Sequence, residues 1–543
     1  MKLLLYFLII TLVGRNEGNN HFPHFRKLKS RATASVQTAA AQDVVRRLIP
    51  DRAEEFNIQV DPQLAEGDKD VFTLVTDKVT GKINITGNAG VVATWGFYHF
   101  LKFHCGCHVS WGGQQLNIPK PLPVIEAPGH RMVSNDQFRY YENVCTVSYS
   151  FVWYNWTDWE RQIDWMALNG INLPLAFNGQ EAIMQRVFTN MNFTQKDLDD
   201  FFTGPAFLAW FRMGNIQKWG GPLPQSWIND QLVLQHRILR RMRSLGMIPV
   251  LAGFGGHVPA NIKKLYPNVN VSTLTNWSQF KPPYSGTTII NFDDPLFAEV
   301  GRRFIEETIK ELGTNHVYAT DLFNEMRPKS SNITYLKMSG AAIYKGMVSA
   351  DPDAVWVMQG WLFQDSSFWK LPQAKALLTS VPMGRMIVLD LFAEIRPLWQ
   401  KYDSFFGQPF VWCMLHNYGG TMDLYGDIES VNVGPSTARS YPNSSMIGIG
   451  ISPEGINQNY VMYEFMLDQG IGPGPKNIAE WISGYAKRRY GVENRYIDIG
   501  WQLLRGTVYS CNKTIHDAHG NVVFTGRPHL NMKEAVSFVT NHF

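Results

Sequence analysis

Eight short apolar runs recur along the chain from His130 onward, separated by longer amphipathic segments. The runs are HRMVSND, INLPLAF, MIPVLAGF, HVYATDLF, AVWVMQGW, GRMIVLDLF, PFVWCMLH and SMIGIGIS. Because apolar and polar positions do not alternate within them, they are typical of strands covered on both faces. Eight strand–helix units over residues 129–472 predict a (β/α)8 barrel of the α/β class. A doubly wound open sheet is the alternative, but no G-x-G-x-x-G follows the first run.

The segments between the runs fit helices. In WTDWERQIDWMALNG, one helical face is formed by Trp156, Trp159, Ile163, Met166 and Ala167. Gly170 follows this segment as a helix-ending signal. The sixth connection, residues 393–408, is thin and contains Pro397, so we expect a short or irregular helix there.

A smaller unit precedes the barrel. Residues 19–128 combine the strand-like pieces VFTLVTDKV and GKINITG with the helical piece AGVVATWGFYHFLKFH. This mixture predicts a small N-terminal α+β domain. The proline-containing stretch QQLNIPKPLPVIEAPGH then indicates a linker into the barrel.

The N-terminus and the sequons point to the secretory pathway. Lys2 precedes an apolar run from Leu3 to Val13, which is short for a membrane span and fits a signal peptide over residues 1–18. A buried first helix is the alternative. Eight N-x-S/T sequons agree with secretion, at Asn84, Asn155, Asn192, Asn270, Asn276, Asn332, Asn443 and Asn512. No later segment predicts a membrane span.

Charge and cysteine usage exclude two classes of function. The net charge is +4 without a basic block, so we expect no nucleic-acid partner. The five cysteines are too few for a disulfide scaffold. Cys105 and Cys107 lie among three histidines, but C-x-C is not a usual zinc spacing. We therefore predict no metal and no cofactor.

A barrel places catalytic groups at the carboxyl ends of its strands. Polar residues follow several of the apolar runs: Asn135, Asp136, Asn178, Gly179, Gln180, Glu181, His257, Asn324, Glu325, Gln359, Trp361, Asp390, His416, Asn417 and Glu454. Aromatic residues make up 13% of the chain. Amides, carboxylates and histidines suit sugar hydroxyls, and tryptophan suits the apolar face of a sugar ring. The pattern favours a carbohydrate pocket.

Glycoside hydrolysis requires two carboxyl groups on opposite sides of the anomeric carbon. Glu325, after the fourth run, is the first candidate, and its alternative is an ion pair with Arg327 in a turn. Glu454, after the eighth run, is the second. Its local context equally fits the start of a helix capped by Ser452. Spacing alone does not choose between these alternatives.

Three further carboxylates lie near strand ends. Asp136, Asp390 and Glu394 could bind hydroxyl groups, but a structural role is the better prediction for each. His257 has no Ser or Cys nucleophile in a G-x-S-x-G setting, so a hydrolase triad is not indicated.

Several long segments carry a family resemblance: RYYENVCTVSYSFVWYNW, WERQIDWMALNGINLPLAFNGQEAI, FFTGPAFLAWFRMGN, FNEM, QGWLF, GQPFVWCMLHNYGG and SPEGINQN. They resemble the α-N-acetylglucosaminidases of glycoside hydrolase family eighty-nine, lysosomal enzymes that remove terminal α-linked N-acetylglucosamine from heparan sulfate. The resemblance extends from about residue 40 to residue 510. It implies a retaining exo-glycosidase whose partner is a glycan, in the lysosome or secreted. Homo-oligomer formation stays open.

The resemblance also implies roles for individual residues. Glu325 matches the general acid/base and Glu454 matches the nucleophile of a double displacement. Residues that match pocket positions contacting the sugar and its N-acetyl group are Asn143, Cys145, Trp210, Asn324 and Trp361, with His257 a weaker match. Cys145 would then line the pocket as a thiol and not act as a nucleophile. The other cysteines are expected in the core.

The family continues into a long α-helical C-terminal domain. Residues 473–543 look like its beginning, with Trp481, Tyr485, Trp501 and Leu504 available for packing. The resemblance therefore implies a C-terminally truncated family member with a more open pocket. A catalytically weak glycan-binding protein is the alternative to an active enzyme.

Overall fold

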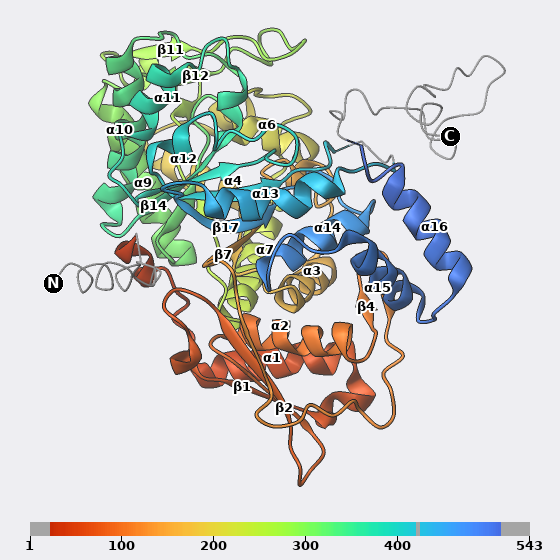
Figure 1. Ribbon diagram of the computed structural model, residues 1–543. Coiled ribbons are helices and arrows are strands. Elements are labelled where there is room, and N and C mark those ends of the chain that lie inside the picture. Colours follow the sequence, from red (N-terminus) through yellow and green to blue (C-terminus); the bar gives the residue numbers. More distant parts are fainter. Residues whose placement is uncertain (1–21, 420–423, 512–543) are drawn as a thin grey trace, which may run out of the picture.

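The computed structural model describes residues 22–419 and 424–511 (Figure 1). The expected signal peptide and the sequon at Asn512 lie outside these residues. Among the helices that the structure describes, none combines the length and the apolar character needed to cross a membrane.

The first part of the described chain is an α+β unit, seen at the bottom of Figure 1. Its sheet has the order β1-β3-β2-β6, with β1 (Phe56–Val60), β2 (Val71–Thr76), β3 (Ile83–Gly87) and β6 (His130–Val133). Strands β1 and β3 are parallel and the other pairs are antiparallel. Helix α2 (Gly90–Phe103) packs on β1, β2 and β3, and α1 (Ala34–Leu48) packs on α2. The structure confirms the α+β unit.

The first apolar run was assigned to the wrong sheet. His130–Val133 form β6, which pairs with β2 in the N-terminal unit, and the first barrel strand is β7 (Phe138–Tyr141). The physical reason is burial: all four residues of β7 are buried, whereas no residue of β6 is. Asn135 and Asp136 consequently precede a barrel strand and lie at the end opposite to the expected site. Asp136 forms an ion pair with Arg439 at 2.6 Å, which is a structural role.

The other seven apolar runs each contain a barrel strand, as predicted. They are β8 (Leu173–Pro174), β9 (Leu251–Ala252), β13 (Val317–Ala319), β14 (Val355–Gln359), β15 (Met386–Asp390), β16 (Phe410–Met414) and β17 (Met446–Ile451). The sheet has the order β8-β7-β17-β16-β15-β14-β13-β9, and all pairs are parallel. A parallel bridge between Leu175 and Val250 links the two end strands. The eight strands therefore follow one another around a barrel.

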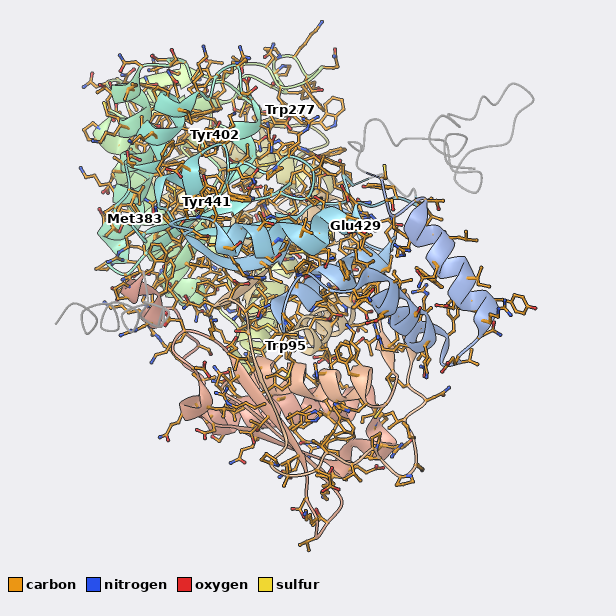
Figure 2. All side chains as sticks on the ribbon, viewed as in Figure 1. Trp95, Trp277, Met383, Tyr402, Glu429 and Tyr441 are labelled. Atoms are coloured by element: carbon orange, nitrogen blue, oxygen red, sulfur yellow. The ribbon has the colours of Figure 1, made fainter. Side chains whose placement is uncertain are left out.

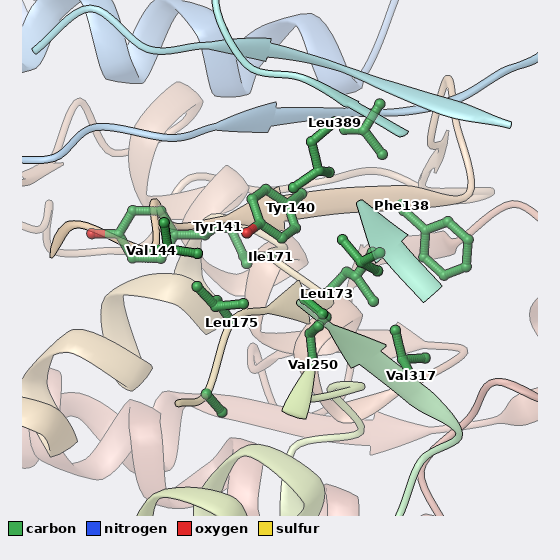
Figure 3. Packing of buried hydrophobic residues seen from close by; sticks show 14 of the residues in the cluster. Phe138, Tyr140, Tyr141, Val144, Ile171, Leu173, Leu175, Val250, Val317 and Leu389 are labelled. Atoms are coloured by element: carbon green, nitrogen blue, oxygen red, sulfur yellow. The ribbon is translucent and has the colours of Figure 1, made fainter. Parts of the chain in front are cut away.

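The barrel interior is filled by apolar side chains from successive strands. Figure 3 shows Tyr140, Leu173, Val250, Val317 and Leu389 close together. Each of these side chains is at most 1% exposed. Burying one such side chain stabilises the fold by roughly 1.5–3 kcal/mol, so the layered interior gives the strand ends a rigid support.

Helices surround the barrel. They are α3 (Trp156–Leu168), α4 (Gln180–Asn190), α7 (Gln225–Ser244), α9 (Pro295–Leu312), α10 (Ile333–Ala350), α11 (Leu371–Leu378), α13 (Ile428–Ser440) and α14 (Tyr460–Leu467). Contacts run from α3 to α7, α4, α9, α10 and α11 in turn, as neighbours in an outer layer. The sixth connection contains only α12 (Asp403–Phe406), whose four residues have φ between +45° and +54°. The predicted irregular helix is thus a left-handed turn.

Helix α3 shows how local sequence sets an element. Asn155 caps its first turn through the backbone N–H groups of Thr157 and Asp158, and the Asp158 side chain accepts from the Asn155 N–H at 3.0 Å. The predicted apolar face packs inward, with Trp159 and Ile163 buried. Gly170 follows with φ +70°. The predicted helix is confirmed.

Two helices, α15 (Ile478–Tyr490) and α16 (Arg495–Gly506), end the described chain. Tyr485 of α15 is buried, with its ring 5.0 Å from that of Trp501. Helix α16 has no buried residue, and Tyr496 is 82% exposed. Of the four residues expected to seek packing, Tyr485 is the one that is fully buried.

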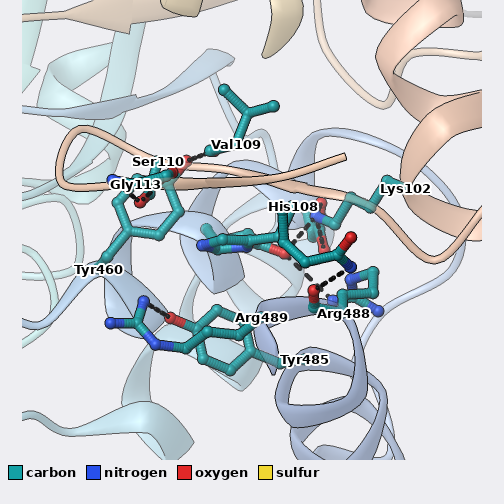
Figure 4. A network of polar contacts seen from close by, with 12 residues as sticks. Lys102, His108, Val109, Ser110, Gly113, Tyr460, Tyr485, Arg488 and Arg489 are labelled. Atoms are coloured by element: carbon teal, nitrogen blue, oxygen red, sulfur yellow. Dashed lines mark hydrogen bonds and ion pairs between the residues drawn. The ribbon is translucent and has the colours of Figure 1, made fainter. Parts of the chain in front are cut away.

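A buried ionic cluster joins α15 to the rest of the molecule (Figure 4). The carboxylate of Glu464, on α14, lies 3.0 Å from Lys102 Nζ of α2 and 3.1 Å from Arg488 Nη2 of α15. Nδ1 of His108, in β4 (His108–Val109), lies 3.1 Å from the other oxygen. Burial alone would raise the pKa of Glu464, but the cation of Lys102, the hydrogen bond from His108 and the cation of Arg488 hold the pKa well below its usual value. The cluster ties the N-terminal unit, the barrel and the C-terminal helices together.

The structure confirms that three of the cysteines expected in the core are buried. Cys105, Cys107 and Cys413 are buried thiols, as expected for core residues. Burial raises the pKa of Cys105 to about 12 and that of Cys107 to about 11, so both thiols stay protonated at neutral pH.

Candidate active site

A cavity of about 80 Å³ opens at the carboxyl ends of the barrel strands. Of the predicted site residues, those that line it are Asn143, Cys145, Trp210, Asn324, Glu325, Trp361 and Glu454. These residues come from distant parts of the chain, and the barrel brings them to one edge. Both predicted carboxyl groups therefore face the same cavity. Among the described residues, no group of three or more potential ligands could hold a metal ion.

Glu325 is held by two indole groups. Trp277 Nε1 donates to Oε2 at 2.6 Å, and Trp361 Nε1 donates to Oε1 at 3.0 Å. The alternative ion pair with Arg327 is wrong, because Arg327 pairs with Asp365 at 2.7 Å. The two N–H donors fix the orientation of the carboxylate at the mouth of the cavity.

Trp277 was not predicted. It lies in the polar loop between β11 (Val271–Thr273) and β12 (Thr288–Ile290), far in sequence from any barrel strand end, and Figure 2 labels its position. Its ring stacks on Trp210 and Phe280, with centroid distances of 6.1 and 5.8 Å. The only sequence signal for this residue is a tryptophan in a polar loop, which does not by itself indicate a site.

Glu454 is half-buried and lines the cavity. Burial raises its pKa to about 7; the hydrogen bond from the Cys145 thiol opposes this rise, and the negative charge of Glu325 adds to it. The backbone N–H of Glu454 donates to the carbonyl oxygen of Asn417 at 3.0 Å. The helix-capping alternative is wrong, because the next helix, α14, begins at Tyr460 and not at Pro453.

Cys145 follows β7 in the chain and lines the same cavity as the two carboxyl groups. Burial raises the pKa of this thiol well above its usual value, and the charges of Glu454 and Glu325 raise it further. The protonated thiol is a hydrogen-bond donor to Glu454 and a poor nucleophile. Asn143 positions it: Asn143 Oδ1 accepts from the Cys145 N–H at 2.8 Å, and Nδ2 donates to the Ser452 carbonyl at 3.0 Å.

Asn324 is locked beside Glu325 by its neighbours. Its Nδ2 donates to Asp321 Oδ2 at 2.9 Å, and its Oδ1 accepts from Asn215 Nδ2 at 3.1 Å. Gln359 donates to the same oxygen of Asp321 at 3.2 Å. Burial raises the pKa of Asp321 to about 6. The φ of Asn324 is +50°, which turns the chain so that consecutive residues 324 and 325 both reach the cavity.

His257 does not line this cavity. It lies in β10 (His257–Val258), which pairs with β12, and its side chain is 4% exposed. Burial lowers its pKa to about 4, so it is a neutral core histidine at neutral pH. The run that contains β9 ends before His257, and the following residues turn away into a small antiparallel sheet.

The other strand-end carboxylates have structural roles. Asp390 accepts from the backbone N–H groups of Leu398 and Trp399, and Glu394 accepts from that of His416 at 2.7 Å. Burial raises the pKa of Asp390 to about 7 and that of Glu394 to about 8. Both side chains hold loops in place, as predicted.

Comparison with known families matches three models to successive parts of the chain. The alpha-N-acetylglucosaminidase (NAGLU) N-terminal domain matches residues 39–124, the tim-barrel domain matches residues 139–472, and the C-terminal domain matches residues 481–542. Human alpha-N-acetylglucosaminidase is 46% identical over 505 residues, covering 92% of this chain and 68% of the human protein.

The chain is also similar to solved structures of family 89 glycoside hydrolases. A family 89 glycoside hydrolase from Clostridium perfringens, in complex with 2-acetamido-1,2-dideoxynojirimycin, is 29% identical with a TM-score of 0.80, covering 88% of this chain and 53% of that chain. The Clostridium perfringens enzyme in complex with its substrate, GlcNAc-alpha-1,4-galactose, is 28% identical with a TM-score of 0.82, covering 93% and 56%. The present chain thus spans about half the length of these bacterial proteins.

Proposed function

Because the chain belongs to the alpha-N-acetylglucosaminidase family of glycoside hydrolases, we propose that it removes terminal non-reducing α-linked N-acetylglucosamine from glycans. The observation that carries this proposal is the presence of Glu325 and Glu454 on one cavity at the carboxyl end of the barrel. A relative of known structure binds GlcNAc-alpha-1,4-galactose as its substrate, which supports the same sugar specificity here.

The proposed reaction is a retaining double displacement. Glu454 attacks the anomeric carbon, while Glu325 gives a proton to the departing oxygen and later takes one from water. Retention requires the two carboxyl groups about 5–5.5 Å apart. Attack by the substrate's own N-acetyl group is disfavoured, because an α-linked leaving group places that amide on the wrong face of the sugar. The enzyme must then supply the nucleophile.

The pair of carboxyl groups holds a proton near neutral pH. The pKa of about 7 at Glu454 belongs to the pair, because Glu325 faces the same cavity and its charge contributes to the shift. The reaction needs this proton on Glu325 and an ionised Glu454. Positive charge that develops at the anomeric carbon in the transition state is stabilised by ionised Glu454. We expect kcat/KM to fall above about pH 7, where the pair loses its last proton.

Heparan sulfate is the proposed natural substrate, and the lysosome or the secreted fraction is the proposed location. The N-terminal apolar run and the sequons support entry into the secretory pathway. The family resemblance supports the substrate and the lysosomal location.

The decisive experiment is turnover of a chromogenic α-N-acetylglucosaminide by the secreted protein. We expect release of the chromophore by the wild type, loss of release in Glu325→Gln and Glu454→Gln, and the α-anomer as the first product. A β-anomer appearing first would reject the nucleophile assignment. No release by the wild type, with retained affinity for N-acetylglucosamine, would favour the glycan-binding alternative.

A further inference from the structure

The mouth of the catalytic pocket lies on the side of Glu325. Of the two proposed catalytic carboxyl groups, Glu325 is exposed, whereas Glu454 is half-buried. A terminal sugar enters from the exposed side, and the rest of its glycan stays outside. Because the general acid protonates the departing oxygen, Glu325 also marks the side on which the rest of the substrate lies. The surface next to Glu325 therefore faces the aglycone, the part of the substrate beyond the cleaved bond.

The loop between β11 and β12 forms part of this surface. Trp277 of the loop lines the pocket, and its Nε1 donates to Glu325 Oε2 at 2.6 Å. Its ring stacks on that of Trp210, another pocket residue, with 28° between the ring planes. Strands β11 and β12 lie at the top of Figure 1, whereas the N-terminal unit lies at the bottom. The loop is thus a part of the pocket wall.

Backbone contacts hold Trp277 in place. Its N–H donates to Ser285 Oγ at 2.8 Å, on the returning side of the loop. Its carbonyl oxygen accepts from the Phe280 N–H at 3.1 Å. Asn276, which directly precedes Trp277, is therefore held at a fixed position relative to Glu325.

Trp277 is also the middle residue of a sequon. Asn276, Trp277 and Ser278 form the N-x-S pattern that accepts an N-linked glycan. The Asn276 side chain is exposed, and its amide group has no hydrogen-bond partner among the described residues. The Nδ2 atom, to which an N-linked glycan is attached, is therefore accessible and uncommitted.

The other sequons do not share this position. Within the described parts of the chain, six more sequon asparagines are present: Asn84, Asn155, Asn192, Asn270, Asn332 and Asn443. None of these six is adjacent in sequence to a residue that lines the catalytic pocket. Asn276 is thus the described sequon that begins at the pocket mouth.

We propose that Asn276 carries an N-linked glycan, which shields the leaving-group side of the catalytic pocket and restricts the substrates to slender, exposed glycan ends. The restriction of substrates rests on the proposed function, and the modification itself does not. Several hydrated sugars at this place obstruct a folded protein that is attached to the terminal sugar, and they leave room for a phenyl group or an unbranched chain. The obstruction acts on the approach of the substrate, so it lowers kcat/KM and leaves kcat unchanged.

The first measurement is peptide mass spectrometry of the protein secreted from animal cells. The glycans are released with a peptide N-glycosidase in water labelled with heavy oxygen, which converts each modified asparagine to a labelled aspartate. Asn270 lies on the same stretch of chain, so fragmentation of the peptide assigns the label to one residue or the other. We expect the label at position 276. An unmodified Asn276 would overturn the proposal.

The second measurement compares protein forms on two substrates. Asn276→Gln and Ser278→Ala each remove the sequon through a different residue, and Asn84→Gln, in β3 of the N-terminal unit, is the matched control. The substrates are a chromogenic α-N-acetylglucosaminide and α-N-acetylglucosamine linked to a folded carrier protein. Both loop variants should raise kcat/KM for the carrier-linked sugar about three- to tenfold, with kcat and the small substrate unaffected. The control variant should behave as the wild type on both substrates.

The outcomes separate this proposal from the proposed function. Equal kcat/KM values of the wild type and both loop variants on the carrier-linked sugar would overturn the shielding role. Equal changes on both substrates would do the same, because they would indicate damage to the contact between Trp277 and Glu325. No turnover of the small glycoside by any form would count against the proposed function, and the mass measurement would still decide whether Asn276 is modified.

Discussion

Replacing Glu454 by glutamine should stabilise the protein at neutral and alkaline pH while abolishing its activity. The pKa of Glu454 is about 7 in the folded protein, against an ordinary value of 4.5. One pKa unit corresponds to 1.36 kcal/mol, so keeping this carboxylate ionised and buried costs about 3 kcal/mol above pH 7. Glutamine has nearly the same shape and carries no charge.

The sign follows from proton binding. Between pH 4.5 and 7 the folded wild type holds a proton on Glu454 that the unfolded chain has lost. The stability due to this proton is fully present below pH 4.5 and is lost as pH rises through 7. The glutamine variant has no such loss, so its advantage should grow from near zero at pH 4 to about 3 kcal/mol at pH 8.

The assay is urea or thermal unfolding of both proteins from pH 4 to pH 8.5. The informative quantity is the change in their difference with pH, because a fixed offset from altered hydrogen bonding cancels. Glu54→Gln is the control, since its side chain is 83% exposed and stays hydrated in both states. A difference that does not vary with pH, or one that shrinks as pH rises, would refute the reasoning.

Four further results are expected. Glu325→Gln should lower kcat/KM by about 10²–10⁴-fold for a phenyl glycoside and much less for a dinitrophenyl glycoside, and equal losses would exclude the acid role. Cys145→Ala removes the donor that lowers the pKa of Glu454, so the basic limb of the pH profile should move to higher pH; a shift to lower pH would contradict the contact. Trp277→Phe keeps the ring but removes the 2.6 Å hydrogen bond to Glu325, and kcat should fall about tenfold with little change in KM. Glu464→Ala leaves the buried Arg488 guanidinium without its carboxylate partner, while Lys102 keeps Asp468 at 2.7 Å, and should destabilise the fold by about 3–5 kcal/mol in urea unfolding; a loss below about 1 kcal/mol would show that the cluster is dispensable.

The sequence predicted the barrel because burial of parallel strands leaves a strong signal. Seven of the apolar runs contain barrel strands, since both faces of each strand are covered and every position favours an apolar residue. The prediction for the first run was wrong because that prediction, too, depends on burial. His130–Val133 form a strand that is not fully covered, whereas Phe138–Tyr141 include Arg139, whose charge disguised a buried strand.

The site was harder to predict because its residues lie close together in the fold but far apart in the sequence. Local sequence offered an ion pair for Glu325 and a helix cap for Glu454, and both alternatives were chemically sound. Each was excluded by a distant partner: Asp365 takes Arg327, and the Asn417 carbonyl accepts the Glu454 N–H. Family resemblance, and not spacing, had favoured the catalytic assignment.

The sequence by itself determined seven of the eight barrel strands, the position of Glu325 and Glu454 after two of them, and the abundance of aromatic residues for a sugar pocket. These depend on hydrophobic periodicity and residue chemistry, which are local properties. Only the tertiary structure decided that Trp277 reaches Glu325, that His257 is buried away from the pocket, and that the Glu454 carboxyl is desolvated enough to hold a proton near pH 7. Those facts depend on burial and on contacts between segments far apart in the chain, and no short stretch of sequence contains them.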